Sequence, residues 1–259
     1  MIGTAFSRRG VGVLLAASLA VGCASVQPAR NPLAQWQGSP NHNARKAQLI
    51  VLHHTQMESA ERALRTLQTR NSQGPVSAHY LIGEDGRIYQ LVADEARAWH
   101  AGAGRWGELT DLNSASIGIE LDNDGSEPFA PAQIQSLLRL LADLTSRLGI
   151  PRHALVAHGD LAPGRKSDPS VLFPWPQLAQ AGYGLWPREP RAEPPPGFDP
   201  WAALRLIGYD LSDPAAALAA FHRRYRGHEG REWQPEDAAV LYDLQLQSMA
   251  LPDGAPAPR

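Results

Sequence analysis

The chain has 259 residues, of which 43% are hydrophobic and 19% are charged. This apolar share is sufficient for a folded core, so the composition excludes a wholly disordered chain. With 24 basic and 26 acidic residues the formal net charge is −2, which argues against a nucleic-acid-binding protein that relies on a basic surface. The single cysteine, Cys23, excludes an internal disulfide framework and a zinc site built from several cysteines.

Residues 1–22 have the pattern of a secretory signal peptide. Arg8 and Arg9 supply the basic start, and the apolar run after them is shorter than the roughly 20 residues that a membrane-spanning helix requires. The segment ends in Leu-Ala-Val-Gly-Cys, which resembles the cleavage box of bacterial lipoproteins, so we expect lipidation at Cys23 and a tether over 23–40. Because no aspartate follows the cysteine, we expect an outer-membrane lipoprotein that faces the periplasm of a Gram-negative bacterium. The alternative is an ordinary secretory signal with an incidental cysteine.

The segment 41–185 alternates short strands with longer helices, which is typical of an α/β domain. Apolar, β-branched runs predict strands at 49–53, 116–121 and 155–157, and an Asp-Gly turn predicts a hairpin that joins 78–82 to 88–92. Apolar residues at helical spacing predict one helix over 60–67 and a longer helix that begins at Pro131 and ends at Gly149.

The composition changes after residue 185. Six prolines occur among the fifteen residues 186–200, which predicts an extended, semi-rigid linker. Helical patterns follow near 201–207, 218–225 and 239–249, so we expect a small three-helix domain over 201–259 with a modest core.

Histidines and a carboxylate follow two of the predicted strands. His53 ends one strand, His158 ends another, and Asp168 comes ten residues later. A catalytic zinc site has three protein ligands and one open position for water, and imidazole and carboxylate groups are both suitable ligands. Successive strand residues point to opposite faces, so at most one of His53 and His54 faces a given site, and parity alone does not decide which. Spacing alone is equally compatible with a chance grouping of exposed histidines.

Five stretches resemble one enzyme family in sequence and in order. They are IVLHHT, SAHYLIGEDGRIYQLV, AWHAG, LNSASIGIELDN and LVAHGDLAPGRKSDPSVLFPW, and they span about residues 50–176. The chain resembles the zinc-dependent N-acetylmuramoyl-L-alanine amidases of the peptidoglycan-recognition (amidase type 2) family, within them the AmpD/AmiD group and its outer-membrane lipoprotein branch. The resemblance implies an α/β fold with a central mixed β-sheet flanked by helices. It also implies hydrolysis, with Zn²⁺ as cofactor, of the amide between N-acetylmuramic acid and L-alanine in peptidoglycan and muropeptides.

The resemblance also assigns roles to individual residues. It places the zinc ligands at His53, His158 and Asp168, and it makes Glu120 and Lys166 the catalytic residues. Glu120 would move a proton from water to the leaving amine, and Lys166 would stabilise the oxyanion. The residues predicted to bind substrate are His54, His79, Trp99, His100 and Asn113. The alternatives are a core role for His79 and Trp99 and a loop contact for Asn113.

Two other functions fit the same residues less well. One is a non-catalytic peptidoglycan-binding protein of the same fold, and the other is a lipoprotein that ties the outer membrane to the wall through its C-terminal helices. These helices resemble a peptidoglycan-binding domain, although they could instead pack on the amidase domain or form a homodimer contact. The histidines outside the motifs are expected to be exposed; they are His42, His153, His222 and His228.

Overall fold

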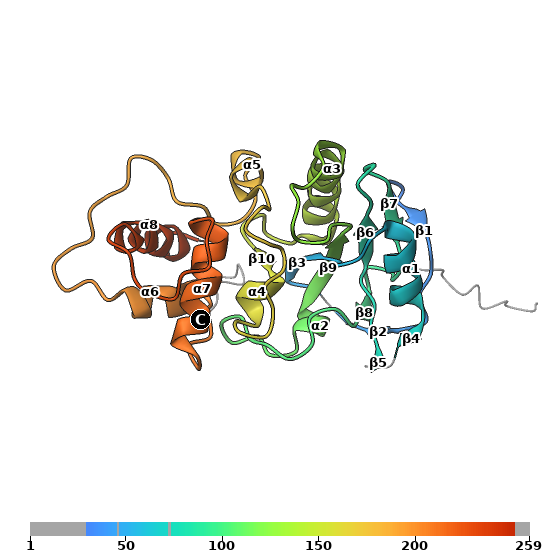
Figure 1. Ribbon diagram of the computed structural model, residues 1–259, viewed down its shortest axis with the longest axis horizontal. Helices are drawn as coiled ribbons and strands as arrows, with labels where there is room; N and C mark the ends of the chain where they lie inside the picture. Colours follow the sequence, from blue (N-terminus) through green and yellow to red (C-terminus); the bar gives the residue numbers. More distant parts are fainter. Residues whose placement is uncertain (1–29, 46, 72–73, 252–259) are drawn as a thin grey trace, which may run out of the picture.

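The computed structural model describes residues 30–45, 47–71 and 74–251 (Figure 1). The predicted signal peptide and the lipidation site Cys23 lie outside these residues, as does the first part of the predicted tether. Within the described part of the chain, no helix is both long and apolar enough to cross a membrane.

Six strands form the central sheet, in the order β1-β7-β6-β9-β3-β10. They are β1 (Gln35–Trp36), β3 (Leu49–His54), β6 (Tyr80–Ile82), β7 (Ile88–Gln90), β9 (Ser116–Leu121) and β10 (Leu155–Ala157). In this sheet β6 and β7 pair antiparallel and the other neighbours pair parallel, so the sheet is mixed, as expected. Two short antiparallel pairs lie outside it, β2 (His42–Ala44) with β8 (Ala96–Ala98) and β4 (Arg70–Asn71) with β5 (Gly74–Pro75).

The helices of the described residues are α1 (Ala60–Gln68), α2 (Leu112–Ala115), α3 (Pro131–Leu148), α4 (His158–Leu161), α5 (Trp175–Gln180), α6 (Pro200–Ile207), α7 (Pro214–Tyr225) and α8 (Asp237–Met249). Their ends follow local rules. The Ser59 hydroxyl accepts a hydrogen bond from the Arg62 N–H at the start of α1. Helix α3 begins with Pro131. Proline is tolerated there because the N–H of the first helical residue has no acceptor within the helix. The helix ends before Gly149, which has a φ of +67°. These bounds confirm the predicted helices, and the predicted strands and hairpin are confirmed as well.

Helices cover both faces of the sheet. Leu81 of β6 packs in a cluster with residues of α1, whereas its neighbours Tyr80 and Ile82 pack in a cluster with residues of α3. Successive strand residues point to opposite faces, so α1 and α3 lie on opposite sides of β6. Because the parallel strands are covered on both sides, β3 is buried along its whole length.

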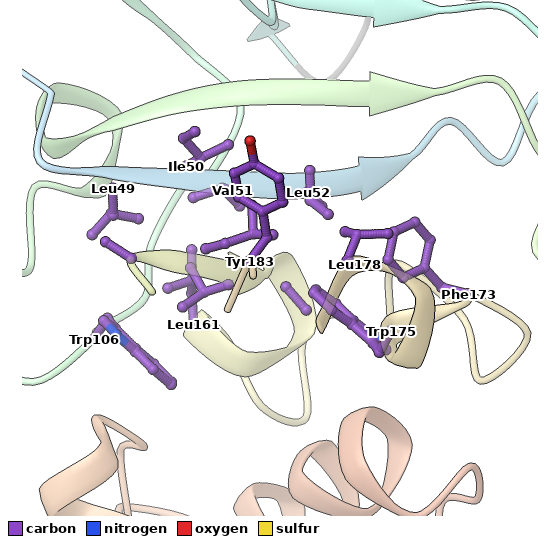
Figure 2. Packing of buried hydrophobic residues seen from close by; sticks show 14 of the residues in the cluster. Leu49, Ile50, Val51, Leu52, Trp106, Leu161, Phe173, Trp175, Leu178 and Tyr183 are labelled. Carbon is purple, nitrogen blue, oxygen red and sulfur yellow. The ribbon is translucent and has the colours of Figure 1, made fainter. Parts of the chain in front are cut away.

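The C-terminal helices extend the core of the sheet domain. Figure 1 shows α7 beside α4, beyond the edge strand β10. One continuous cluster of buried apolar residues includes Leu155 of β10, Trp175 of α5 and Phe221 of α7. Figure 2 shows Trp106 and Trp175 between β3 and the C-terminal helices.

The expectation that the four histidines outside the motifs are exposed is correct for His42 alone, and it is most clearly wrong for His222. Its side chain is fully buried in α7, with Nδ1 2.6 Å from the Gly230 carbonyl oxygen and Nε2 2.8 Å from Asp237 Oδ2. Helix α7 is enclosed by α4 on one side and by the chain that leads to α8 on the other, so it has no solvent-facing side at this residue. His42 is exposed, and His153 and His228 are half-buried.

Candidate metal centre

The register of the sheet brings two histidines to one edge. Strands β3 and β10 are parallel neighbours, and Ala157 lies opposite Leu52. The residue after Leu52 is His53, and the residue after Ala157 is His158, the first residue of α4, so the two histidines lie side by side. Asp168 reaches the same point from the loop after α4, where its carbonyl oxygen accepts a hydrogen bond of 2.8 Å from the Gly159 N–H.

Three side chains share a single point in space. Nδ1 of His53 lies 2.9 Å from Nδ1 of His158, and Oδ2 of Asp168 lies 3.1 Å from the first nitrogen and 3.0 Å from the second. All three side chains are buried, and the ligand atoms they offer lie within 4.8 Å of one another. Two imidazoles and one carboxylate from separate stretches of chain could hold a metal ion, and such a three-ligand set suits a catalytic zinc site.

The second nitrogen of each histidine is bonded in a way that suits a metal ligand. Nε2 of His158 donates to the Ala101 carbonyl oxygen over 2.9 Å, which leaves Nδ1 with its lone pair towards the centre. Nε2 of His53 lies 2.9 Å from Nδ1 of His100, and Nε2 of His100 lies 3.3 Å from the Ser116 hydroxyl. Partners of this kind fix the tautomer and the ring orientation of metal-binding histidines. The donor set therefore fits zinc.

The charges at the centre also suit a cation. Burial lowers the pKa of His53 to about 4, so its imidazole is neutral and able to bind a metal near pH 7. Burial opposes ionisation of Asp168, but its hydrogen bonds with His158 and His53 hold the pKa of that carboxyl well below its ordinary value. The centre thus combines the neutral imidazole of His53 and the carboxylate of Asp168 with the imidazole of His158.

Glu120 lies beside the centre on the neighbouring strand. It pairs with His53 in the register of β9 and β3, and its buried Oε2 has no hydrogen-bond partner among the described residues. Burial raises the pKa of Glu120 to about 8; the nearby Asp168 raises it further and Lys166 lowers it. A carboxyl group with a raised pKa and a free oxygen is the expected form of a general base and acid.

A cavity of about 170 Å³ lies over the centre. Lys166, whose side chain is exposed, lines it together with Glu120 and the three candidate ligands. The rest of its wall comes from α1 and the loops around β3 and β8, and the members of this wall are His54, Thr55, Gln56, Met57, Ala63, Thr66, Leu67, Val76, Ser77, Trp99 and His100. The cavity can hold a small group next to the centre while the remainder of a ligand extends over the surface.

The structure separates the residues predicted to bind substrate. His54, Trp99 and His100 line the cavity, although His54 is buried and its Nδ1 accepts a hydrogen bond from the Ser170 N–H. His100 stands behind His53 as its hydrogen-bond partner.

His79 and Asn113 are outside the cavity lining. His79 is fully buried, and its Nδ1 accepts from the Gly118 N–H while its Nε2 lies 3.0 Å from the Ala96 carbonyl oxygen. This geometry agrees with the alternative of a core histidine. Asn113 Oδ1 accepts hydrogen bonds from the N–H groups of His100 and Ala101, which agrees with the alternative of a loop contact.

Two features of the site have little signal in the sequence. The wall that α1 contributes, with Thr66 and Leu67, depends on how the helix packs. The other is Gly118, where a Cβ would lie 2.4 Å from the His100 ring, so only glycine leaves room for that ring. A glycine inside a predicted strand can indicate such a close approach, and this was the available signal.

Comparison with known proteins agrees with this geometry. Residues 43–171 match the family model of N-acetylmuramoyl-L-alanine amidase. AmiD of Escherichia coli, an N-acetylmuramoyl-L-alanine amidase, is 37% identical over a match that covers 85% of this chain and 90% of that protein. The chain belongs to the N-acetylmuramoyl-L-alanine amidase family.

Solved structures of other family members have the same fold. AmpDh3 of Pseudomonas aeruginosa superimposes with a TM-score of 0.72 and 30% identity, covering 88% of this amidase and 98% of that chain. AmiD of Escherichia coli, in complex with anhydro-N-acetylmuramic acid-L-Ala-D-gamma-Glu-L-Lys, superimposes with a TM-score of 0.67 and 33% identity, covering 85% of this amidase and 93% of that chain.

Proposed function

We propose that this amidase hydrolyses the amide bond between N-acetylmuramic acid and the L-alanine of the stem peptide in peptidoglycan or its fragments, with zinc as its cofactor. The observation that carries the proposal is the convergence of His53, His158 and Asp168 on one point, with the free carboxyl oxygen of Glu120 beside it. AmiD and AmpDh3, which share the fold, have been solved with anhydromuramic peptides bound, and this supports the same substrate class here.

The three candidate ligands would hold the zinc ion. Bound zinc supplies a Lewis acid that brings the pKa of a water molecule towards neutrality and polarises the scissile carbonyl group. The chain holds these ligands ready, because His158 and His53 are already oriented by Ala101 and His100 and Asp168 is already ionised.

Glu120 carries the proton in this reaction. As a carboxylate it takes a proton from the attacking water, and as a carboxylic acid it returns that proton to the leaving nitrogen. An amide nitrogen is a poor leaving group until it is protonated, so one residue that performs both transfers is sufficient. The raised pKa of Glu120, about 8, suits the second transfer, and the charge of a nearby cation lowers that pKa and favours the first.

Lys166 would stabilise the developing oxyanion. It lines the same cavity as Glu120 and the candidate ligands, and its side chain is exposed. A donor aimed at the developing negative charge lowers the barrier, because its interaction with that oxygen is stronger in the transition state than in the ground state.

The decisive experiment is the digestion of purified wall sacculi and soluble muropeptides by the purified amidase. Mass spectrometry should detect free stem peptides together with glycan that lacks peptide, and a chelator should abolish both products until zinc is added back. Binding to sacculi without release of peptide would instead support the non-catalytic peptidoglycan-binding protein. The presence of Asp168 in the ligand set argues for the enzyme.

The cellular location is a separate proposal, supported by the sequence around Cys23. We infer a lipoprotein of the outer membrane that faces the periplasm. Metabolic labelling with a radioactive fatty acid should label the wild-type protein and leave Cys23→Ala unlabelled, and density fractionation should place the labelled protein with outer-membrane markers. Secretion of an unlabelled wild-type protein would contradict the lipid anchor.

The C-terminal helices carry a further proposal from the sequence, namely that the region 201–259 adds affinity for peptidoglycan. The helical patterns of this region support it, and co-sedimentation of the inactive full-length protein with sacculi tests it. A homodimer stays a prediction, which light scattering on a size-exclusion column checks.

A further inference from the structure

Helix α7 covers the outer edge of the central sheet next to the metal centre. Strand β10 is the last strand of the sheet, so the carbonyl groups on its outer side have no neighbouring strand. Arg224 of α7 reaches this edge, and its Nη2 donates a hydrogen bond of 2.9 Å to the Leu155 carbonyl oxygen. The C-terminal helices thus contact the strand that leads directly into His158.

Asp160 joins α7 to the start of α4 through a buried ion pair. Its Oδ2 accepts from Arg224 Nη1 over 2.6 Å and from the Ala157 N–H over 3.0 Å, and its Oδ1 accepts from the Tyr209 hydroxyl over 2.8 Å. The exposed fractions are 1% for Asp160, 4% for Arg224 and 2% for Tyr209. The carboxylate therefore links two residues of the C-terminal helical region to the backbone amide immediately before His158.

The Arg224 side chain is itself held in place. Its guanidinium group stacks over the Trp175 ring, 4.4 Å from the ring centroid, and a Cβ on Gly184 would lie 3.0 Å from its Nη2. A planar guanidinium group that donates from two nitrogens and stacks on an aromatic ring has one preferred position. Because Arg224 is fixed in this way, its hydrogen bonds fix the Leu155 carbonyl group and the Asp160 carboxylate as well.

Arg223, the preceding residue of α7, packs against Gly159 of α4. Its Nη1 lies 2.6 Å from the position that a Cβ on Gly159 would take, so its guanidinium group packs directly against that glycine. The Gly159 N–H donates to the carbonyl oxygen of Asp168. The two successive arginines of α7 therefore pack against the segments that carry His158 and Asp168.

We propose that Arg224 and Asp160 are positioning residues of the metal centre, and that α7 completes this centre in addition to any role of the region 201–259 in binding peptidoglycan. The inference rests on the proposed zinc amidase function. Asp160 accepts a hydrogen bond from the amide before His158, and the two donors of Arg224 hold the Asp160 carboxylate and the Leu155 carbonyl group in place. Zinc ligands must be held within about 0.5 Å of their required geometry, so a small displacement of α4 weakens the site.

The test uses the full-length protein and two substitutions of Arg224. Arg224→Met keeps most of the side-chain volume but removes the charge and every donor, which leaves the Asp160 carboxyl buried without its cation. Arg224→Lys restores the charge without the fork of two donors. Arg188→Met is the matched control, because Arg188 pairs with Asp243 of α8 and does not line the cavity over the candidate ligands.

Zinc affinity, measured by competition with a coloured chelator at a temperature where each variant is folded, is the main readout. We expect Arg224→Met to bind zinc about 10–100-fold more weakly than wild type, the range that outer partners of metal sites usually contribute. Arg224→Lys should recover part of this loss, and Arg188→Met should bind zinc as tightly as wild type. In the metal-free protein, hydrogen exchange at the amide of Ala157 should accelerate in Arg224→Met alone.

Tyr209→Phe and Asp160→Asn keep the test open if Arg224→Met does not fold. Each removes one interaction of the cluster and preserves its volume, and both should weaken zinc binding. Wild-type zinc affinity in these two variants and in Arg224→Lys would overturn the proposal. A wild-type protein that binds zinc but releases no peptide would contradict the proposed function. The zinc affinities of the variants would still test the positioning role of Arg224 and Asp160.

Discussion

The Nδ1 atoms of His53 and His158 lie 2.9 Å apart, although 105 residues separate them in the sequence. Two imidazole nitrogens at this distance repel each other unless a proton or a cation lies between them. The Asp168 carboxylate, 3.0–3.1 Å from both, adds a negative charge that favours a cation. The fold therefore holds these groups in an arrangement that a bound divalent ion makes favourable.

Zinc should stabilise the folded protein. A ligand that binds the native state alone adds about 2.7 kcal/mol when its concentration is 100 times its dissociation constant. We expect a chelator to lower the melting temperature of the wild-type amidase and added zinc to restore it, as followed by circular dichroism. Asp168→Ala should show no such shift, and an equal shift in that variant would contradict the assigned ligands.

Replacement of Asp168 by alanine should abolish both zinc binding and hydrolysis, because a three-ligand site loses its only charged ligand. The control is Asp124→Ala, which removes an exposed carboxylate that binds the N–H and hydroxyl of Ser126. Metal content by mass spectrometry and peptide release by chromatography provide the two measurements. Full activity of Asp168→Ala would refute the ligand set.

Glu120→Ala should retain zinc and lose turnover by roughly 10²–10⁴-fold, the usual contribution of a general base. Glu127→Ala, which removes an exposed carboxylate from the segment between β9 and α3, should leave turnover unchanged. The measurement is kcat with a soluble muropeptide, together with the zinc content of each variant. Loss of zinc in Glu120→Ala would instead identify Glu120 as a ligand.

Glu120 should also make the metal-free protein less stable as the pH rises. Burial raises its pKa from 4.5 to about 8, so the folded protein keeps a proton that the unfolded chain releases between these values. Stability is therefore lost as the pH rises through this window, by up to about 1.4 kcal/mol for each pH unit. The side chain of Glu120→Gln does not ionise. The free energy of unfolding of this variant, measured with urea, should therefore exceed that of the wild type by a margin that grows from pH 5 to pH 8. A difference in the free energy of unfolding that is equal at both pH values would argue against a buried, protonated Glu120.

His100 should affect zinc affinity through His53. Removal of the ring in His100→Ala takes away the partner of His53 Nε2, and such partners contribute roughly 10–100-fold in metal affinity or activity. His153→Ala, which removes a half-buried histidine from another part of the domain, is the control. Competition with a chelator measures the zinc affinity of both variants. Equal affinities of His100→Ala and His153→Ala would show that His100 has no positioning role.

Much of the fold is predictable because local rules govern the elements. The strand at 116–121 has its predicted bounds, and the helix predicted to begin at Pro131 and end at Gly149 spans Pro131–Leu148 with Gly149 as its C-cap. An apolar run, a proline and a glycine act locally, so these signals can be read from the sequence. The three C-terminal helices were predicted from their apolar spacing as well. The burial of His222 was not predictable, because it depends on what packs against α7.

The sequence by itself determined the chemistry that is available: two histidines at strand ends, a carboxylate ten residues after the second, and a glutamate in a neighbouring strand. Residue types and strand periodicity are local properties, so they can be read along the chain. Strand periodicity leaves open which of His53 and His54 meets His158. The family resemblance implies His53, and the tertiary structure brings His53 to His158 through the register between β3 and β10. Only the tertiary structure decided that His79 belongs to the core and that Arg224 of α7 supports α4, since contacts between distant segments arise only when the sheet and the helices pack together.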